Sequence, residues 1–69
     1  MKLSARNVIK GKVKKVTHGA VNSEVVLELP GGIEVVSIIT RQSAETMDLA
    51  QGVEAYAVVK ASNVMIAVD

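Results

Sequence analysis

Five short runs rich in β-branched residues, divided by turn signals, constrain the fold of this chain more than any other feature. Val, Ile and Thr favour a pleated, half-buried strand, and each run has the length of one strand. The runs span residues 7–16, 21–29, 33–40, 53–60 and 64–68. The strongest break between them is Pro30-Gly31-Gly32. Only residues 41–48 have a helical spacing of apolar side chains. The sequence therefore predicts three strands, one short helix and two further strands.

This order predicts an all-β fold. Five strands of this length, connected in this way, are typical of a small, partly open Greek-key barrel of the oligonucleotide/oligosaccharide-binding (OB) type, with one short helix between strands 3 and 4. Gly11 lies in the middle of the first run, where a glycine often marks a bulge or a barrel bend.

The apolar content of the chain predicts a homo-oligomer. The chain has only 69 residues, yet 49% of them are hydrophobic, and a domain near this size buries only about 60% of its unfolded surface. Alternation along the second and third strands puts Val26, Val36 and Ile38 on the face that a one-sided sheet would keep polar. We expect a second subunit to cover that face.

Several classes of protein are disfavoured by the composition. There is no Cys, one His and a net charge of only +1, so thiolate metal sites and strong attraction to polyanions are not expected. His18 has no partner in a recognisable acid–base motif, and Gly31-Gly32 lacks the spacing and lysine of a phosphate loop. No signal peptide or membrane-spanning run is visible. We expect a cytoplasmic protein that is neither an enzyme nor membrane-bound.

Three separated segments offer hydrogen-bond donors and contain no carboxylate. They are residues 4–7, 40–43 and 60–62. Each oxygen of a tetrahedral dianion can only accept hydrogen bonds, so donors without acceptors suit a small oxyanion. The three segments together predict an oxyanion site.

The first segment would supply a charged planar fork from Arg6, a hydroxyl from Ser4 and the backbone N–H of Ala5. The alternative is a frayed terminus with a solvated Arg6. In the second segment Thr40 is placed as the N-cap of the helix, and Ser43 lies in its first turn, where backbone N–H groups favour an anion. The alternative is that Thr40 only caps the helix, which is worth ~1 kcal/mol.

In the third segment Lys60 would complete the neutralisation of a dianion, with the Ser62 hydroxyl beside it. The alternative for Lys60 is a polar residue that ends a strand. The loop that contains Gly19, Ala20 and Asn22 is a candidate for a second anion site, because successive N–H groups around a glycine can form an anion-binding concavity. An ordinary turn is the alternative there.

The order and spacing of these segments resemble the Mop domain, whose whole-chain version is called molbindin. The resemblance rests on residues 4–13, 24–26 and 58–61, on Thr40 with Ser43, and on Val64. It covers nearly the whole chain, so residues 1–69 would form a single Mop domain.

The resemblance implies an OB-like fold and a bound molybdate, or the similar tungstate, as the ligand. It implies molybdate contacts from Ser4, Arg6, Thr40, Ser43 and Lys60, with Ser62 and the Ala5 amide as further candidates. In that family such pockets lie between subunits, and the assembly is a hexamer built as a trimer of dimers. The implied role is storage or buffering of the oxyanion in the cytoplasm.

Two other functions stay open. Lys10, Lys12, Lys14 and Lys15 form a basic run that could serve an OB-type nucleic-acid-binding module, although Tyr56 is the only aromatic residue on which a base could stack. A purely structural oligomer without a ligand is the other possibility. We expect a small oxyanion and further copies of the chain as partners, and no nucleic acid.

Overall fold

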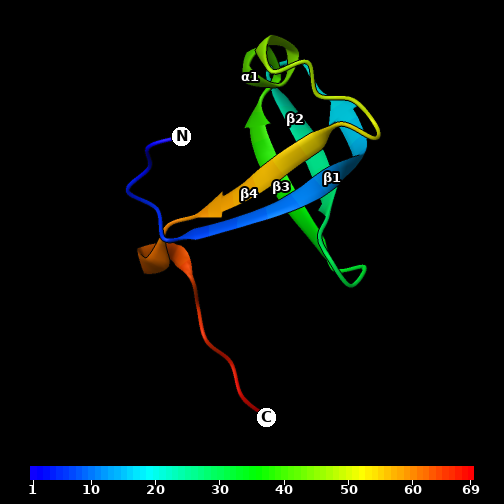
Figure 1. Ribbon diagram of the computed structural model, residues 1–69. Coiled ribbons are helices and arrows are strands. Elements are labelled where there is room, and N and C mark those ends of the chain that lie inside the picture. The colour runs from blue at the N-terminus through cyan, green and yellow to red at the C-terminus, as the bar shows by residue number, and fades with distance from the viewer.

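The computed structural model describes residues 1–69 as one curled antiparallel sheet with a short helix at its edge (Figure 1). The strands are β1 (Asn7–His18), β2 (Asn22–Glu28), β3 (Glu34–Thr40) and β4 (Glu54–Val59), in the spatial order β3-β2-β1-β4. Helix α1 (Arg41–Thr46) joins β3 to β4, and the 3₁₀ turn η1 (Ala61–Asn63) follows β4. The sheet curls into a partly open barrel because the two halves of the long strand β1 pair with different strands.

The first half of β1 pairs with β4 and its second half pairs with β2, so the strand must bend in between. A register shift between Val13 and Lys15 marks a bulge in the pairing with β2. A Cβ atom on Gly11 would lie 2.5 Å from the carbonyl oxygen of Glu28. Gly11 therefore permits a close approach of two backbones, while the bulge itself lies two residues further on.

The core lies inside the curl and is small. Val13, Val25, Leu27, Leu29 and Ala57 form one buried cluster. Alternate β2 residues point inward as predicted, because strand side chains alternate between faces.

Helix α1 begins as predicted and ends earlier than predicted. The Thr40 hydroxyl accepts a hydrogen bond from the Ser43 backbone N–H, so Thr40 is the N-cap. Residues 41–48 were expected to be helical, but the helix ends at Thr46. Asp48 has a φ of 52°, in the left-handed region that a right-handed helix cannot contain.

The prediction of a fifth strand at residues 64–68 is wrong for the single chain. This tail runs away from the barrel in Figure 1, and Met65, Ile66 and Val68 are 93%, 86% and 91% exposed. A strand exists only where a neighbouring backbone completes its hydrogen bonds, and no such neighbour lies beside the tail. The all-β, OB-like class with one short α-helix is confirmed, with four strands.

The apolar outer face is present. Val36 and Ile38 are 61% and 62% exposed on β3, and Val26 is half-buried. No helix in the chain is both long and apolar enough to pass through a bilayer.

Candidate oxyanion site

The first and third predicted segments meet at one end of the barrel. Asn7, the first residue of β1, pairs with Val59, the last residue of β4, and its side-chain amide donates to the Val59 carbonyl over 3.1 Å. Arg6 precedes this pair and Lys60 follows it, so the two cations lie at the same end of the β1–β4 ladder. Two segments far apart in sequence thus supply positive charge at one place.

Both cations are free of carboxylate partners. The ion pairs in the structure join Lys10 with Glu54, Lys14 with Glu34, and Arg41 with Glu45. Neither Arg6 nor Lys60 takes part in any of them. Their charge is therefore available to an external anion.

Ser4, Ala5 and Ser62 lie at the same end of the barrel. Ser4 and Ala5 directly precede Arg6, and Ser62 lies within η1. Ser4 and Ser62 are exposed, and Ala5 is half-buried. This end of the barrel offers two hydroxyls, two cations and a backbone amide.

The second segment lies elsewhere in the same chain. Thr40 and Ser43 belong to the β3–α1 junction, and Figure 1 shows α1 apart from η1. No hydrogen bond or ion pair connects the junction with Arg6 or Lys60. Within one chain, the seven predicted contacts therefore form two groups.

At the β3–α1 junction, the cap uses some of the donors that the sequence suggested for an anion. Thr40 Oγ1 accepts from the Ser43 backbone N–H over 3.1 Å and donates to Ser43 Oγ over 2.8 Å. The Ser43 hydroxyl keeps its own proton for a further acceptor. Of the two hydroxyls, that of Ser43 is thus the one whose proton remains free.

The candidate second anion site lies beside this junction. Asn22 pairs with Thr40 across the β2–β3 ladder. The Gly19 N–H donates to the Asn22 carbonyl over 2.7 Å, and the Gly19 carbonyl accepts from Arg41 over 3.4 Å. Gly19, Ala20 and Asn22 form a turn whose Gly19 N–H is already bonded, which favours the ordinary-turn interpretation.

The same region contains a polar contact that the sequence did not predict. His18 Nδ1 lies 2.7 Å from Ser23 Oγ, and Ser23 is only 1% exposed. Nearby, the hydrogen bond from Arg41 lowers the pKa of Glu45. The sequence signal for the His18–Ser23 contact was Ser23 itself, a serine on the inward face of an otherwise apolar strand.

The basic run on β1 is partly neutralised. Lys10 and Lys14 are paired with carboxylates, and the hydrogen bonds that the two lysines donate to these partners raise the pKa of both lysines. Lys12 and Lys15 are exposed and unpaired. A nucleic-acid-binding surface here would have fewer free charges than the sequence suggested.

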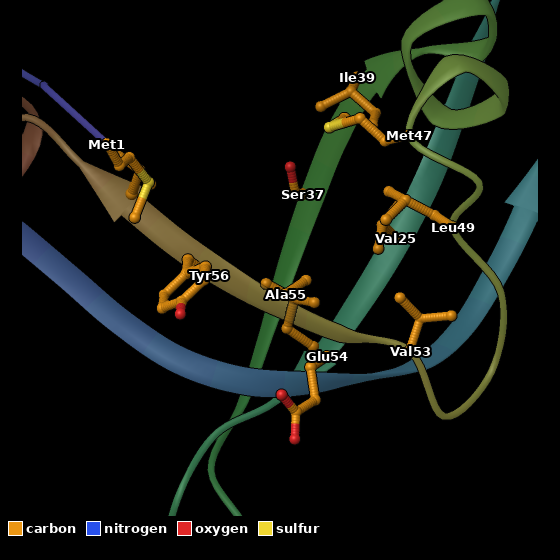
Figure 2. A pocket seen from close by; sticks show the side chains of 12 residues that line it. Met1, Val25, Ser37, Ile39, Met47, Leu49, Val53, Glu54, Ala55 and Tyr56 are labelled. Carbon is orange, nitrogen blue, oxygen red and sulfur yellow. The ribbon is translucent and has the colours of Figure 1, made fainter.

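The two main cavities are apolar and lie between β3 and β4. One has a volume of about 380 Å³ and the other of about 470 Å³. Figure 2 shows the side chains that line the first cavity, among them Tyr56 and Ala55 of β4 and Ser37 and Ile39 of β3. None of the predicted oxyanion residues lines either cavity. An oxyanion would find almost no donors in these cavities.

The chain matches proteins associated with molybdenum over nearly its full length. The TOBE domain model matches residues 3–66. Molybdenum-pterin-binding protein 3 of Clostridium pasteurianum is 50% identical over 66 residues, which cover 96% of this chain and 97% of that protein.

Solved structures agree with this match. MopII from Clostridium pasteurianum superimposes with a TM-score of 0.91 at 46% identity, covering 97% of this chain and all of that one. The cytoplasmic molybdate-binding protein ModG, with molybdate bound, gives 0.91 at 48% identity and covers 94% of this chain and 46% of its own. The chain therefore belongs to the TOBE domain family and, within it, to the Mop or molbindin branch.

Proposed function

We propose that this protein binds molybdate as an intact oxyanion, through hydrogen bonds and charge. The observation that carries the proposal is the Asn7–Val59 pair, which brings the unpaired cations Arg6 and Lys60 to one end of the barrel. The relatives named for molybdenum binding, and ModG with molybdate bound, support the choice of anion.

Each side chain has a distinct role in this proposal. Arg6 presents several N–H donors in a fixed plane and can bond two oxygens of the anion at once. Lys60 adds a second positive charge, so the pair balances a dianion. The Ser4 and Ser62 hydroxyls and the Ala5 backbone N–H donate hydrogen bonds to the remaining lone pairs of the anion.

Thr40 and Ser43 would join the site from a neighbouring subunit. Their separation from Arg6 and Lys60 within the chain requires this if they contact the same anion. The free Ser43 proton suits the role, and Thr40 would hold Ser43 in place as well as approach the anion. The pocket would then lie between chains.

We further propose that the protein is a hexamer arranged as a trimer of dimers, in which residues 1–69 act as a single Mop domain. The exposed Val36 and Ile38 support association. Its role would be storage or buffering of molybdate in the cytoplasm, the compartment given for ModG. Tungstate should bind similarly, because its charge and size are close to those of molybdate.

The donor set also predicts selectivity. Hydrogen phosphate carries a proton at neutral pH, and a pocket made only of donors leaves that proton without an acceptor. The cost is about 1–3 kcal/mol. Phosphate should therefore compete poorly with molybdate.

Calorimetric titration with sodium molybdate tests the site. A hydrogen bond to a charged group contributes about 1.5–3 kcal/mol, so Arg6→Ala and Lys60→Ala should each weaken binding by roughly 10- to 150-fold. Lys15→Ala is the matched control, because Lys15 is exposed, unpaired and distant in register from the site. Wild-type affinity in both test variants would reject the site.

A salt titration with an oligonucleotide tests the alternative function. A nucleic-acid-binding module would bind it with an affinity that falls steeply as salt rises. Tight molybdate binding without oligonucleotide affinity would reject that alternative.

A further inference from the structure

The position of helix α1 on the barrel depends on contacts with other segments. A helix of six residues is too short to be stable alone. Its one buried residue is Ala44, which is 1% exposed. The hydrogen bonds between Thr40 and Ser43 join the helix only to the residue that precedes it. Burial of one alanine holds the helix on the barrel but leaves its rotation about that contact open, so a further contact is needed.

Arg41 supplies such a contact, with the turn between β1 and β2. Its guanidinium Nη1 donates to the Gly19 carbonyl over 3.4 Å, and its backbone N–H donates to the Val21 carbonyl over 2.8 Å. Among the side-chain hydrogen bonds of residues 40–46, the one to Gly19 alone reaches another segment. Arg41 therefore fixes the start of α1 to a turn that lies 22 residues earlier in the chain.

Glu45 holds the guanidinium of Arg41 in this position. Arg41 Nε donates to Glu45 Oε1 over 2.8 Å, between residues that are neighbours on one face of the helix. This hydrogen bond lowers the pKa of Glu45, so the carboxylate stays charged at neutral pH. The carboxylate also balances the charge of Arg41. Arg41 thus contributes a fixed geometry to this junction and not a third positive charge for the anion.

The geometry fixed by Arg41 includes the free hydroxyl of Ser43. Ser43 is half-buried and lies in the same turn of α1, two residues after Arg41. Just before the helix, Thr40 pairs with Asn22 at the end of the β2–β3 ladder. A movement of α1 against the β1–β2 turn would therefore shift the Ser43 hydroxyl while the ladder stays intact.

The other half of the candidate site is held by a contact of the same kind. The Asn7 side-chain amide donates to the Val59 carbonyl, 52 residues away in the chain, directly beside Arg6 and Lys60. In both halves, a side chain next to the predicted binding residues donates to a backbone carbonyl of a distant segment. Loss of either contact should loosen the binding residues beside it.

We propose that Arg41, held by Glu45, is a positioning residue that sets the Ser43 hydroxyl in place to bind the oxyanion. This inference rests on the proposed function, because it takes Ser43 as a contact of the anion. Arg41 acts through Ser43 and does not contact the anion itself.

A double-mutant cycle in molybdate titrations tests whether Arg41 acts through Ser43. Arg41→Ala should weaken binding about 3- to 10-fold in the wild-type background. It should weaken binding by less than about 2-fold in the Ser43→Ala background, where no hydroxyl remains to be positioned.

Two further variants complete this test. Arg41→Lys should bind as weakly as Arg41→Ala, because a lysine cannot make two directed hydrogen bonds from one plane. Thr46→Ala is the matched control, because Thr46 is exposed on the same helix. Wild-type affinity of Arg41→Ala, equal losses in the two backgrounds, or full affinity of Arg41→Lys would each overturn the proposal.

Amide hydrogen exchange without molybdate separates this inference from the proposed function. The Ser43 backbone N–H donates to Thr40 Oγ1, so it should exchange at least about 3-fold faster in Arg41→Ala, where α1 is held less firmly. Amides around Val16 should keep their wild-type rates, because the β1–β2 ladder is unchanged. A wild-type chain that binds no molybdate would reject the proposed function. Unchanged exchange at Ser43 would overturn its positioning by Arg41, whether or not molybdate binds.

Discussion

The two sides of the barrel differ in how far a single chain completes them. On the side formed by β1 and β2, Val13, Val25 and Leu27 are buried, and β2 pairs with the second half of β1. On the side formed by β3 and β4, Ile38 and Val58 are 62% and 45% exposed beside an open groove. We call the β1–β2 side the closed side, because its apolar side chains are buried within one chain. We call the β3–β4 side the open side, because its apolar side chains remain exposed. We therefore expect contacts within one chain to stabilise the closed side, and association with another copy to stabilise the open side.

The largest contrast is expected between Leu27→Ala and Ile38→Ala. Leu27 is 6% exposed, and its truncation should cost about 2–5 kcal/mol through lost burial and a residual cavity, at any protein concentration. Ile38→Ala should have an effect that grows with protein concentration, because Ile38 is exposed in the single chain and would be buried only in the proposed oligomer. Urea unfolding at two concentrations checks both, and a concentration-independent loss in Ile38→Ala would break the comparison.

A smaller loss is expected for Gly11→Ala on the closed side. The added Cβ would meet the Glu28 carbonyl oxygen at 2.5 Å and Leu29 Cδ2 at 2.9 Å. The oxygen belongs to the backbone and cannot rotate away, so we expect destabilisation of about 1–3 kcal/mol. Gly31→Ala is a poor control because Gly31 has a φ of 86°, which an alanine adopts only with strain. Ala20→Gly is a better control because Ala20 lies at an exposed turn. Thermal unfolding that leaves Gly11→Ala at wild-type stability would contradict the close approach.

A pair of substitutions at Thr40 sharpens the comparison at the end of β3. Thr40→Ala removes the helix cap and should cost about 1 kcal/mol. Thr40→Asp restores a capping oxygen but adds a negative charge, so stability should return while molybdate affinity falls further. Unfolding and molybdate titrations measured together decide the role of Thr40. If Thr40→Asp binds molybdate as the wild type does, Thr40 caps the helix and nothing more.

The smallest effect concerns the ion pair that ties the two sides together, Lys14 of β1 with Glu34 of β3. The hydrogen bond from Lys14 to Glu34 raises the pKa of Lys14 above the ordinary value of 10.5. Its stabilisation is therefore present below pH 10.5 and is lost as pH rises through the raised value. Because the pair is exposed, the effect should be slight.

Thermal unfolding between pH 9 and pH 12 measures this contribution. The Glu34→Gln variant should show less of the alkaline decline than the wild type. Identical declines in the two proteins would show that the pair contributes nothing measurable.

The features that the sequence predicted correctly depend on local residues, and those that it predicted wrongly or missed depend on distant ones. The break at Pro30-Gly31-Gly32 and the cap at Thr40 depend on neighbouring residues, and both are confirmed. The strand at residues 64–68 was wrong for the isolated chain because its pairing depends on something beyond its own neighbours. The contact between His18 and Ser23 was missed because it depends on the turn between two strands.

The candidate site divides in a similar way. Residue types alone indicated an oxyanion, and the placement of Arg6 and Lys60 at one end of the barrel follows from the register of β1 with β4. That register could not be read from either segment by itself. The distance of Thr40 from both cations depends on where α1 lies, which the strand pattern did not define.

The division of β1 between two partners has a consequence for local opening. Its first six residues are held by β4 and its last part by β2, so the two halves can unzip separately. An anion that bridges Arg6 and Lys60 would stabilise the pairing of β1 with β4 and leave the pairing of β1 with β2 unaffected. Ligand would then slow amide hydrogen exchange near Asn7 and Val59 and leave the rates around Val16 and Val25 unchanged.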